Sequence, residues 1–330
     1  MRRPQEFSFT FTDYLLAEVG GVPLDALHWD VDAICRAYDR LLPIAQRLGV
    51  PAPKPSLAGF AYPHVASLGA EIVFPPDSEP KPLPVLESPA QIDELCEPED
   101  YLRAELIQDR LHLGRELKRR RPEAWDGIGH SYEGPLTTAT LLLGTDFLTL
   151  PYDDPARAHK LLDFCVRSAL NYFAALCRHW GWSIEPGTVN IPDDFAGMFR
   201  PELFQEFVLP YWEKFYQGLK ATRRTLHSEL LHPGHLPFLG ELKIEQFDPS
   251  GDQYLTPEIL RDQCPARFML SIHSWLVHDM PIAELQDLYR HLATFEPSAI
   301  ILEFNSLCDE PKIKALLDVA RELKGQEKLE

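Results

Sequence analysis

The chain has few basic side chains, no paired cysteine motif and no long apolar run. Its 330 residues include 32 Lys and Arg against 50 Asp and Glu, a formal net charge of −18. A site for the phosphate backbone of nucleic acids needs clustered cations, so this balance argues against one. No apolar stretch approaches the ~20 residues of a membrane span, and no secretory signal peptide is expected. The six cysteines lack CxxC spacing, which is typical of reduced thiols in a cytoplasmic protein.

Two common nucleotide-binding motifs are also missing, namely GxGxxG and GxxxxGK[ST]. What the sequence does contain is a succession of helical and strand-like segments. Residues 1–55 are predicted to form a helical N-terminal extension packed on the rest of the chain. Its clearest helix runs from Val31 to Leu48, where Gly49 ends it. A further charged helix is predicted for residues 99–121.

From about residue 125 onward, short apolar runs alternate with amphipathic segments. The expected strands are 127–130, 187–191, 225–227, 242–247, 267–272 and 298–304. The expected helices are 155–180, 201–222, 256–264, 281–294 and 310–323. Such alternation predicts a parallel sheet with right-handed crossovers. At this length we expect an α/β fold of the (β/α)₈ TIM-barrel type, with residues 56–330 as the catalytic barrel; an open doubly wound sheet is the alternative.

Polar side chains follow nearly every expected strand. In chain order they are His130 and Glu133, Asp193 and Asp194, His227 and Glu229, Asp248, His273, and then Glu303, Asn305 and Cys308. His64, which follows an aromatic segment, is expected to close the same site. The active site of such a barrel gathers at the carboxyl ends of its strands. The sequence therefore predicts that these side chains converge.

Several segments resemble the uroporphyrinogen decarboxylase superfamily. Glu133–Thr137 is similar to its Gly-Pro-Phe-Thr segment, and Tyr152–Pro155 is similar to the start of one of its helices. Asp193–Met198, followed by Pro201–Phe204 and Phe207–Tyr211, resembles the most specific signature of that superfamily. The resemblance spans roughly residues 55–325.

The resemblance points to the zinc-dependent methyltransferase branch. The decarboxylases carry an Arg-rich N-terminal segment that grips substrate carboxylates, whereas this chain has Phe7–Tyr14 in that region. The methyltransferases bind zinc through His-x-Cys on one strand and a cysteine on the last. The corresponding residues here are His227, Glu229 and Cys308. Glutamate replaces the first cysteine, and zinc accepts a carboxylate oxygen.

This branch implies methyl transfer between a small methylated substrate and a corrinoid (cobalamin) carried by a partner protein, with zinc assisting as a Lewis acid. The substrate is expected to be a methoxy-aromatic, a methylamine or a similar compound. The expected catalytic residues are Glu229, His273, Asp193 and Asp194. The expected substrate-binding residues are His130, Glu133, Asp248, Glu303, Asn305 and His64. Two alternatives remain: a metal-free decarboxylase, and a barrel that binds without catalysing.

Structural roles compete with these assignments. Asp193 and Asp194 are residues that commonly cap helices. A free cysteine such as Cys308 is most often a small buried hydrophobe. Glu229 has the alternative of a salt bridge to a loop cation.

Overall fold

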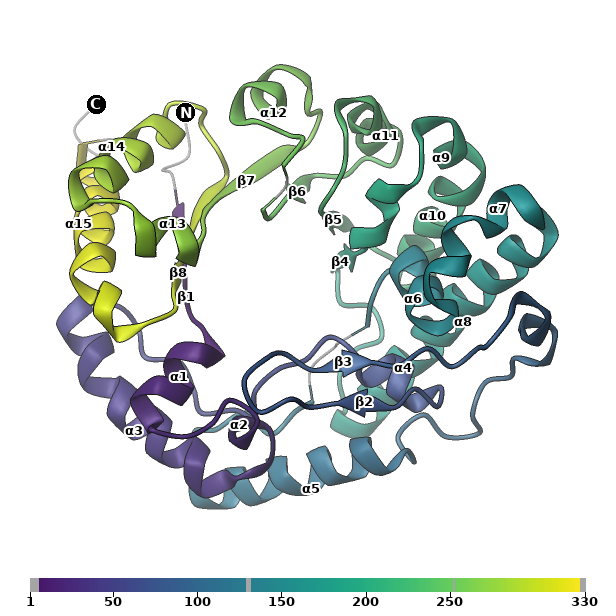
Figure 1. Ribbon diagram of the computed structural model, residues 1–330, viewed down its shortest axis with the longest axis horizontal. Helices are drawn as coiled ribbons and strands as arrows, with labels where there is room; N and C mark the ends of the chain where they lie inside the picture. Colours follow the sequence, from purple (N-terminus) through teal and green to yellow (C-terminus); the bar gives the residue numbers. More distant parts are fainter. Residues whose placement is uncertain (1–5, 129–131, 252, 327–330) are drawn as a thin grey trace.

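Six of the described strands build a curled sheet inside a ring of helices (Figure 1). The computed structural model describes residues 6–128, 132–251 and 253–326. Six parallel strands run in the order β1-β8-β7-β6-β5-β4, and β2 and β3 form a separate antiparallel pair. The strands are β1 (Glu6–Phe11), β2 (Ile72–Val73), β3 (Lys81–Pro82), β4 (Thr188–Pro192), β5 (Arg223–His227), β6 (Gln246–Asp248), β7 (Arg267–Ile272) and β8 (Ala299–Phe304).

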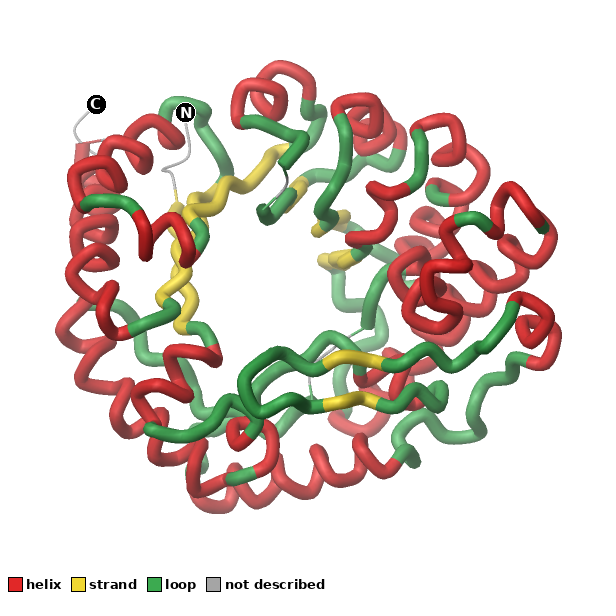
Figure 2. The backbone as a smooth tube through the Cα atoms, viewed as in Figure 1, coloured by secondary structure: helices red, strands yellow, loops and turns green. Residues whose placement is uncertain are grey.

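Helices lie along the outside of the strands (Figure 2). The α-helices are α1 (Asp13–Gly20), α2 (Ala26–Trp29), α3 (Val31–Leu48), α4 (Pro63–Ser67), α5 (Glu105–Arg120), α6 (Pro135–Leu143), α7 (Leu150–Asp153), α8 (Pro155–Trp180), α9 (Pro201–Phe207), α10 (Leu209–Gly218), α11 (Leu236–Glu241), α12 (Pro257–Gln263), α13 (Ser274–Asp279), α14 (Ile282–Ala293) and α15 (Glu310–Gln326). The 3₁₀ turns are η1 (Pro89–Glu94), η2 (Gly144–Leu148), η3 (Asp194–Met198), η4 (Pro233–His235) and η5 (Leu307–Asp309).

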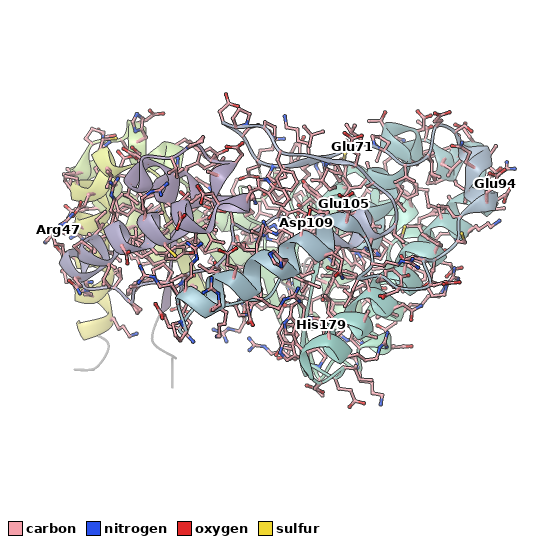
Figure 3. The ribbon with its side chains drawn as sticks, turned by 90° about the horizontal axis from the view of Figure 1, so that it is seen from below. Arg47, Glu71, Glu94, Glu105, Asp109 and His179 are labelled. Carbon is pink, nitrogen blue, oxygen red and sulfur yellow. The ribbon has the colours of Figure 1, made fainter. Side chains whose placement is uncertain are left out.

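Local sequence signals explain the longest helices. Helix α3 begins where the Asp30 side chain accepts two backbone N–H groups, and it ends at Gly49, whose φ of 64° suits a residue without Cβ. Helix α8 begins with Pro155 at its first position, after the Asp154 side chain caps Arg157. Both helices match the ranges that the sequence predicts. Helix α5 is shorter than predicted, and its outer face presents Glu105 and Asp109 to solvent (Figure 3).

The alternation of buried residues along β7 and β8 explains why they sit within the sheet. Every second residue of each strand is buried, and these side chains join the same core as the apolar faces of α14 and α15. The remaining residues of each strand face the other side of the sheet. The loops that carry the candidate functional residues follow the carboxyl ends of these strands. No described helix is long and apolar enough to cross a bilayer.

The N-terminal segment contains a strand that the sequence patterns did not predict. Residues 6–11 form β1, which pairs in parallel with β8 from Glu6 opposite Ala299 to Phe11 opposite Phe304. This part of the predicted helical extension therefore contributes to the sheet itself. The period-two pattern of Phe7, Phe9 and Phe11 is the signal that could have predicted the strand.

Other boundaries also differ from the predictions. The predicted helix 201–222 is divided into α9 and α10, which meet at Val208, two residues before Pro210. The predicted strand 242–247 is reduced to β6, because residues 242–244 complete the turn after α11. The predicted strand 127–130 lies partly outside the described residues. The α/β fold with a curled parallel sheet is confirmed, with six strands in the described part of the chain.

Candidate functional site

Five side chains at the carboxyl ends of adjacent strands form a row in which carboxylates and imidazoles alternate. In sheet order from β4 to β8 the row contains Asp194, His227, Asp248, His273 and Glu303. The strands are parallel, so their carboxyl ends meet at one edge of the sheet, where the active sites of such folds lie. We call these five residues the acid–imidazole row. All five were predicted as site residues.

His227 has a carboxylate on each side. Its Nδ1 lies 3.1 Å from Oδ2 of Asp248, and its Nε2 lies 3.6 Å from Oδ1 of Asp194. Burial disfavours the charged ring, but the hydrogen bond to Asp248 and the charges of both carboxylates outweigh burial and raise the pKa of His227 to about 9. His227 is therefore an imidazolium at neutral pH, stabilised by two anions.

His273 lies next to Glu303, the last carboxylate of the row. Its Nδ1 lies 3.8 Å from Oε2 of Glu303, and its ring stacks on Trp275 with centroids 4.2 Å apart. The backbone N–H of Ser274 donates to the same carboxylate at 3.4 Å. The polar contact with His273 outweighs the effect of burial and keeps the pKa of Glu303 below its usual value. Glu303 is therefore ionised at neutral pH.

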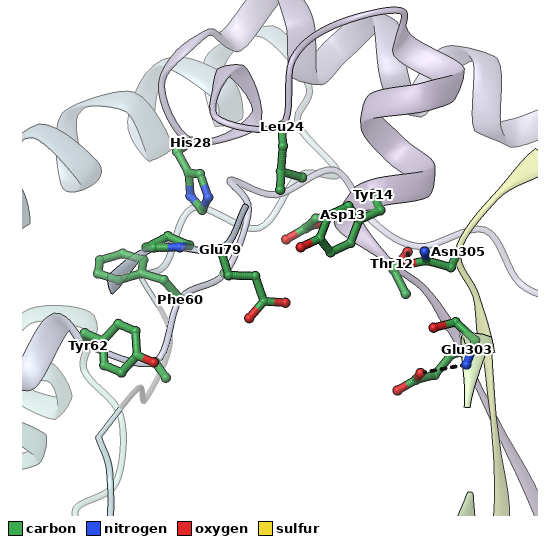
Figure 4. Close-up of a pocket in the computed structure, with 14 residues that line it drawn as sticks. Thr12, Asp13, Tyr14, Leu24, His28, Phe60, Tyr62, Glu79, Glu303 and Asn305 are labelled. Carbon is green, nitrogen blue, oxygen red and sulfur yellow. Dashed lines mark hydrogen bonds between the residues drawn. The ribbon is translucent and has the colours of Figure 1, made fainter. Parts of the chain in front are cut away.

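A cavity of about 310 Å³ opens beside Glu303 (Figure 4). It lies between the segments that follow β8 and β1, the stretch 59–62, and Glu79 with Pro80. Its fourteen lining residues include three carboxylates, on Asp13, Glu79 and Glu303, and no Lys or Arg. The three carboxylates point into the same space (Figure 4). Aromatic rings complete the wall: Tyr14, Phe60 and Tyr62. We call this cavity the acidic cavity.

Asp13 is placed by the junction of β1 and α1. The Thr12 hydroxyl donates to Oδ1 of Asn305 at 2.8 Å, which ties the end of β1 to the end of β8. Burial and the nearby charge of Glu79 raise the pKa of Asp13 to about 6, and the buried cation Arg110 offsets only part of this effect. The two carboxylates thus repel each other in the cavity, and a bound cation would relieve that repulsion. The sequence predicts Glu303 and Asn305 at this place, but misses Asp13 and Glu79.

Comparison with known proteins identifies the family. The sequence profile named uroporphyrinogen decarboxylase (URO-D) matches residues 63–248, more than half of the chain. The chain belongs to the URO-D family. A solved structure, a methyltransferase from Methanosarcina mazei, has a similar fold with a TM-score of 0.69 at 15% sequence identity, covering 98% of this chain and 94% of that one. No curated protein sequence is similar enough to count as a relative.

Asp193 plays a structural part in this URO-D family chain. Its side chain is fully buried and accepts the N–H of Thr137 at 2.7 Å and Nε1 of Trp212 at 2.7 Å. It thereby holds the first turn of α6 against α10. Because Asp193 is shielded from solvent and its oxygens are taken by these donors, we correct its predicted catalytic role to a positioning one. Its neighbour Asp194 faces the site and also accepts the backbone N–H of Glu229 at 3.2 Å.

Glu133 is a buried acid beside the row. It is 9% exposed, and its Oε2 has no hydrogen-bond partner among the described residues. Burial and the charges of Asp194 and Asp193 raise its pKa well above the usual value. Burial therefore favours the neutral form of Glu133, although the charge of the nearby His227 opposes this shift. His130, predicted at the same loop, lies outside the described residues.

His64 lies in the core and not at the mouth of the site. It is 1% exposed, and its Nε2 is 3.0 Å from the hydroxyl of Ser168 on α8. Burial lowers the pKa of His64 to about 3. The short helix α4 directs this ring toward α8, so we correct its predicted substrate-binding role to packing. The aromatic stretch before it, with Phe60 and Tyr62, reaches the cavity instead.

The predicted zinc ligands are not brought together. His227 lies between Asp194 and Asp248, whereas Sγ of Cys308 lies 3.8 Å from Nδ1 of His278. Among the described residues, the group whose ligand atoms all lie within 4.8 Å of one another is His278, Cys308 and Asp309. The set His227, Glu229 and Cys308 does not fit one ion in this structure. We therefore assign no catalytic step to a metal at His227.

Proposed function

We propose that this chain is a cytoplasmic methyltransferase that takes a methyl group from a small methylated ammonium compound and passes it to a corrinoid on a partner protein. Two findings support the reaction class: the fold shared with a methyltransferase over nearly the whole length, and the family membership. The choice of substrate rests on the lining of the acidic cavity, because its described lining residues include three carboxylates and no Lys or Arg, and the guanidinium of Arg110 is buried behind His28 and Phe60. The six free cysteines agree with a reducing compartment.

The chemistry of an ammonium substrate suits this cavity. When the C–N bond of a methylated ammonium breaks, the electron pair stays on nitrogen and the amine leaves as a neutral molecule. An uncharged amine would have to leave as an anion, which is a far poorer leaving group. The carboxylates of Asp13, Glu79 and Glu303 favour the cationic form through charge attraction. The ring of Tyr14 can add cation–π attraction of about 0.5–2 kcal/mol, whereas Phe60 already has the guanidinium of Arg110 5.0 Å from its ring centroid.

The corrinoid would accept the methyl group, and a partner protein would have to bring it to the strand ends. Exposed apolar side chains follow three strands at this end: Met198 after β4, Tyr254 after β6 and Trp275 after β7, with exposures of 51%, 40% and 56%. Met and aromatic side chains are enriched in protein–protein interfaces. We assign this end of the molecule as the docking face of the partner.

The same proposal includes closure of the sheet into an eight-stranded barrel. Six of the eight strand positions are filled by the paired strands of the described residues. Between β4 and β1 run the segments that follow α3 and α5, and the backbone N–H of Trp125 donates to the carbonyl of Pro55 at 2.8 Å. We assign the two remaining strand positions of the barrel to these two segments.

Methoxy-aromatic substrates are the second candidate, and His227 favours them. A methoxy oxygen needs a proton as its bond to carbon breaks, and the raised pKa of His227 keeps a proton available near the site. A decarboxylase, the remaining alternative, is disfavoured because a carboxylated substrate would meet three carboxylates in the cavity.

The proposed activity is tested by supplying the purified protein with a reduced corrinoid protein and a panel of methylated compounds. We expect methylated ammonium compounds to give a kcat/KM at least about tenfold above that of methoxy-aromatics and methanol. Replacing the cavity residue Glu79 by Gln is expected to lower kcat/KM for the ammonium by about tenfold, or 1.4 kcal/mol.

The matched control is Glu71→Gln, since Glu71 is an exposed glutamate of the same segment that does not line the cavity (Figure 3). It is expected to leave kcat/KM unchanged. Corrinoid methylation by the methoxy compounds alone would overturn the substrate assignment, and absence of methyl transfer from every compound would overturn the function.

A further inference from the structure

We propose that His278, Cys308 and Asp309 bind a divalent metal ion, with zinc preferred, at a place separate from the acid–imidazole row. The three residues offer an imidazole nitrogen, a thiolate sulfur and a carboxylate oxygen, the donor set that zinc accepts most readily. They come from two loops, since His278 lies in α13 after β7 whereas Cys308 and Asp309 lie in η5 after β8.

The spacing of the ligand atoms fits one tetrahedral ion. Nδ1 of His278 lies 3.3 Å from Oδ2 of Asp309 and 3.8 Å from Sγ of Cys308. Zinc bonds of about 2.0–2.3 Å with tetrahedral angles place neighbouring ligand atoms roughly 3.3–3.7 Å apart. The two observed separations lie within about 0.1 Å of that range. The third pair, Sγ of Cys308 and the Asp309 carboxylate, lies within 4.8 Å, so binding would draw these two side chains together by about 1 Å at most.

Neighbouring side chains position the three ligands, and two of the ligands are open to solvent. Asp309 is 4% exposed, whereas His278 and Cys308 are exposed, so the ion reaches a buried carboxylate through two solvent-facing donors. Lys312 donates to the carbonyl of His278, and its Nζ lies 3.9 Å from Oδ1 of Asp309, which leaves Oδ2 for the ion. The hydroxyl of Ser306 lies 3.4 Å from the sulfur and can donate a hydrogen bond to it when the ion is bound. Water would take the fourth position.

The position of the site suggests what the ion does. Helix α13 begins at Ser274, which lines the acidic cavity and donates to Glu303, and η5 follows Asn305, which lines the same cavity. An ion between His278 and Cys308 would join these two loops and stiffen that wall of the cavity. We assign it a bracing role, because its ligands lie outside the cavity lining. The inference rests on this geometry and does not depend on the proposed reaction.

The test is the metal content of protein purified without a polyhistidine tag, loaded with zinc and dialysed. We expect about one zinc per chain in the unaltered protein. His278→Ala and Cys308→Ser are each expected to weaken zinc binding at least about 100-fold, since loss of even a supporting residue around a metal commonly costs 10–100-fold. Cobalt in place of zinc should give a thiolate charge-transfer band, which Cys308→Ser removes.

Matched controls make the outcome decisive. Cys96→Ser alters another exposed thiol, and His227→Ala alters the histidine of the acid–imidazole row; both should keep the zinc and the cobalt band. Thermal unfolding checks that each variant is folded. The proposal is overturned if the unaltered protein binds no zinc, if His278→Ala keeps it, or if His227→Ala loses it while His278→Ala does not.

Discussion

Replacing His227 by alanine is expected to lower kcat/KM for methoxy-aromatic substrates by at least about 100-fold, the smallest effect typical of a lost acid–base group. The imidazolium separates Asp194 and Asp248, which lie 3.6 Å and 3.1 Å from its two ring nitrogens. Without the imidazolium, the carboxylates of Asp194 and Asp248 lose the positive charge that lies between them. The measurement is methyl transfer to the corrinoid protein, with His179→Ala on the outer end of α8 as control (Figure 3).

The same variant should also change stability in a defined pH range. The folded-state pKa of His227 is raised from 6.5 to about 9, so protonation stabilises the fold fully below pH 6.5, and this contribution is lost as the pH rises through about 9. The shift corresponds to on the order of 3 kcal/mol. We expect His227→Ala to unfold more easily than the unaltered protein at pH 6, with the difference shrinking above pH 9. A difference that does not depend on pH would contradict the ion-pair account of the row.

Replacing Asp13 by asparagine is expected to stabilise the free protein while weakening substrate binding. The pKa of Asp13 is raised from 3.8 to about 6, so its ionised form is disfavoured in the fold, and this cost grows as the pH rises from about 4 to 6. Asp13→Asn removes the cost, and we expect a gain of about 1–3 kcal/mol in unfolding free energy at pH 8. At pH 3.5 the two proteins should be nearly equal.

Asp13→Asn is expected to weaken substrate binding, although it stabilises the free protein. A cation favours the ionised Asp13, so KM for the ammonium substrate should rise as the pH falls below about 6. Asp13→Asn is expected to raise KM about tenfold at pH 8 and to remove this dependence. Asp109→Asn on the outer face of α5 serves as control (Figure 3). If Asp13→Asn destabilised the protein and left KM unchanged, Asp13 would be a structural residue and not part of the binding site.

The parts of the fold that depend on local signals were predictable. Helices α3 and α8 follow from caps and periodicity, and β7 from an apolar run with marked ends. The row Asp194, His227, Asp248, His273 and Glu303 was predictable because the carboxyl ends of parallel strands meet. This rule fixes which strand ends converge, without needing any side-chain geometry.

What could not be predicted depends on the direction that a side chain takes. Asp193 and Asp194 are adjacent in sequence, yet one is buried against Trp212 and the other faces His227. Cys308 follows β8 by only a few residues, but η5 turns its sulfur toward His278. Glu79 reaches the cavity from a loop that no periodic pattern marks. These placements come from tertiary packing, which a single sequence does not encode in a readable form.

The most direct test of a cation-selective cavity is calorimetric titration of the purified protein with a trimethylammonium compound and with its uncharged analogue, in which carbon replaces nitrogen. The two ligands have the same shape and differ in charge alone. Binding of the ammonium at least about tenfold tighter than the analogue at pH 8, with the preference lost in Glu79→Gln, is the predicted result. Equal binding of both ligands, or tighter binding of the uncharged one, would contradict it.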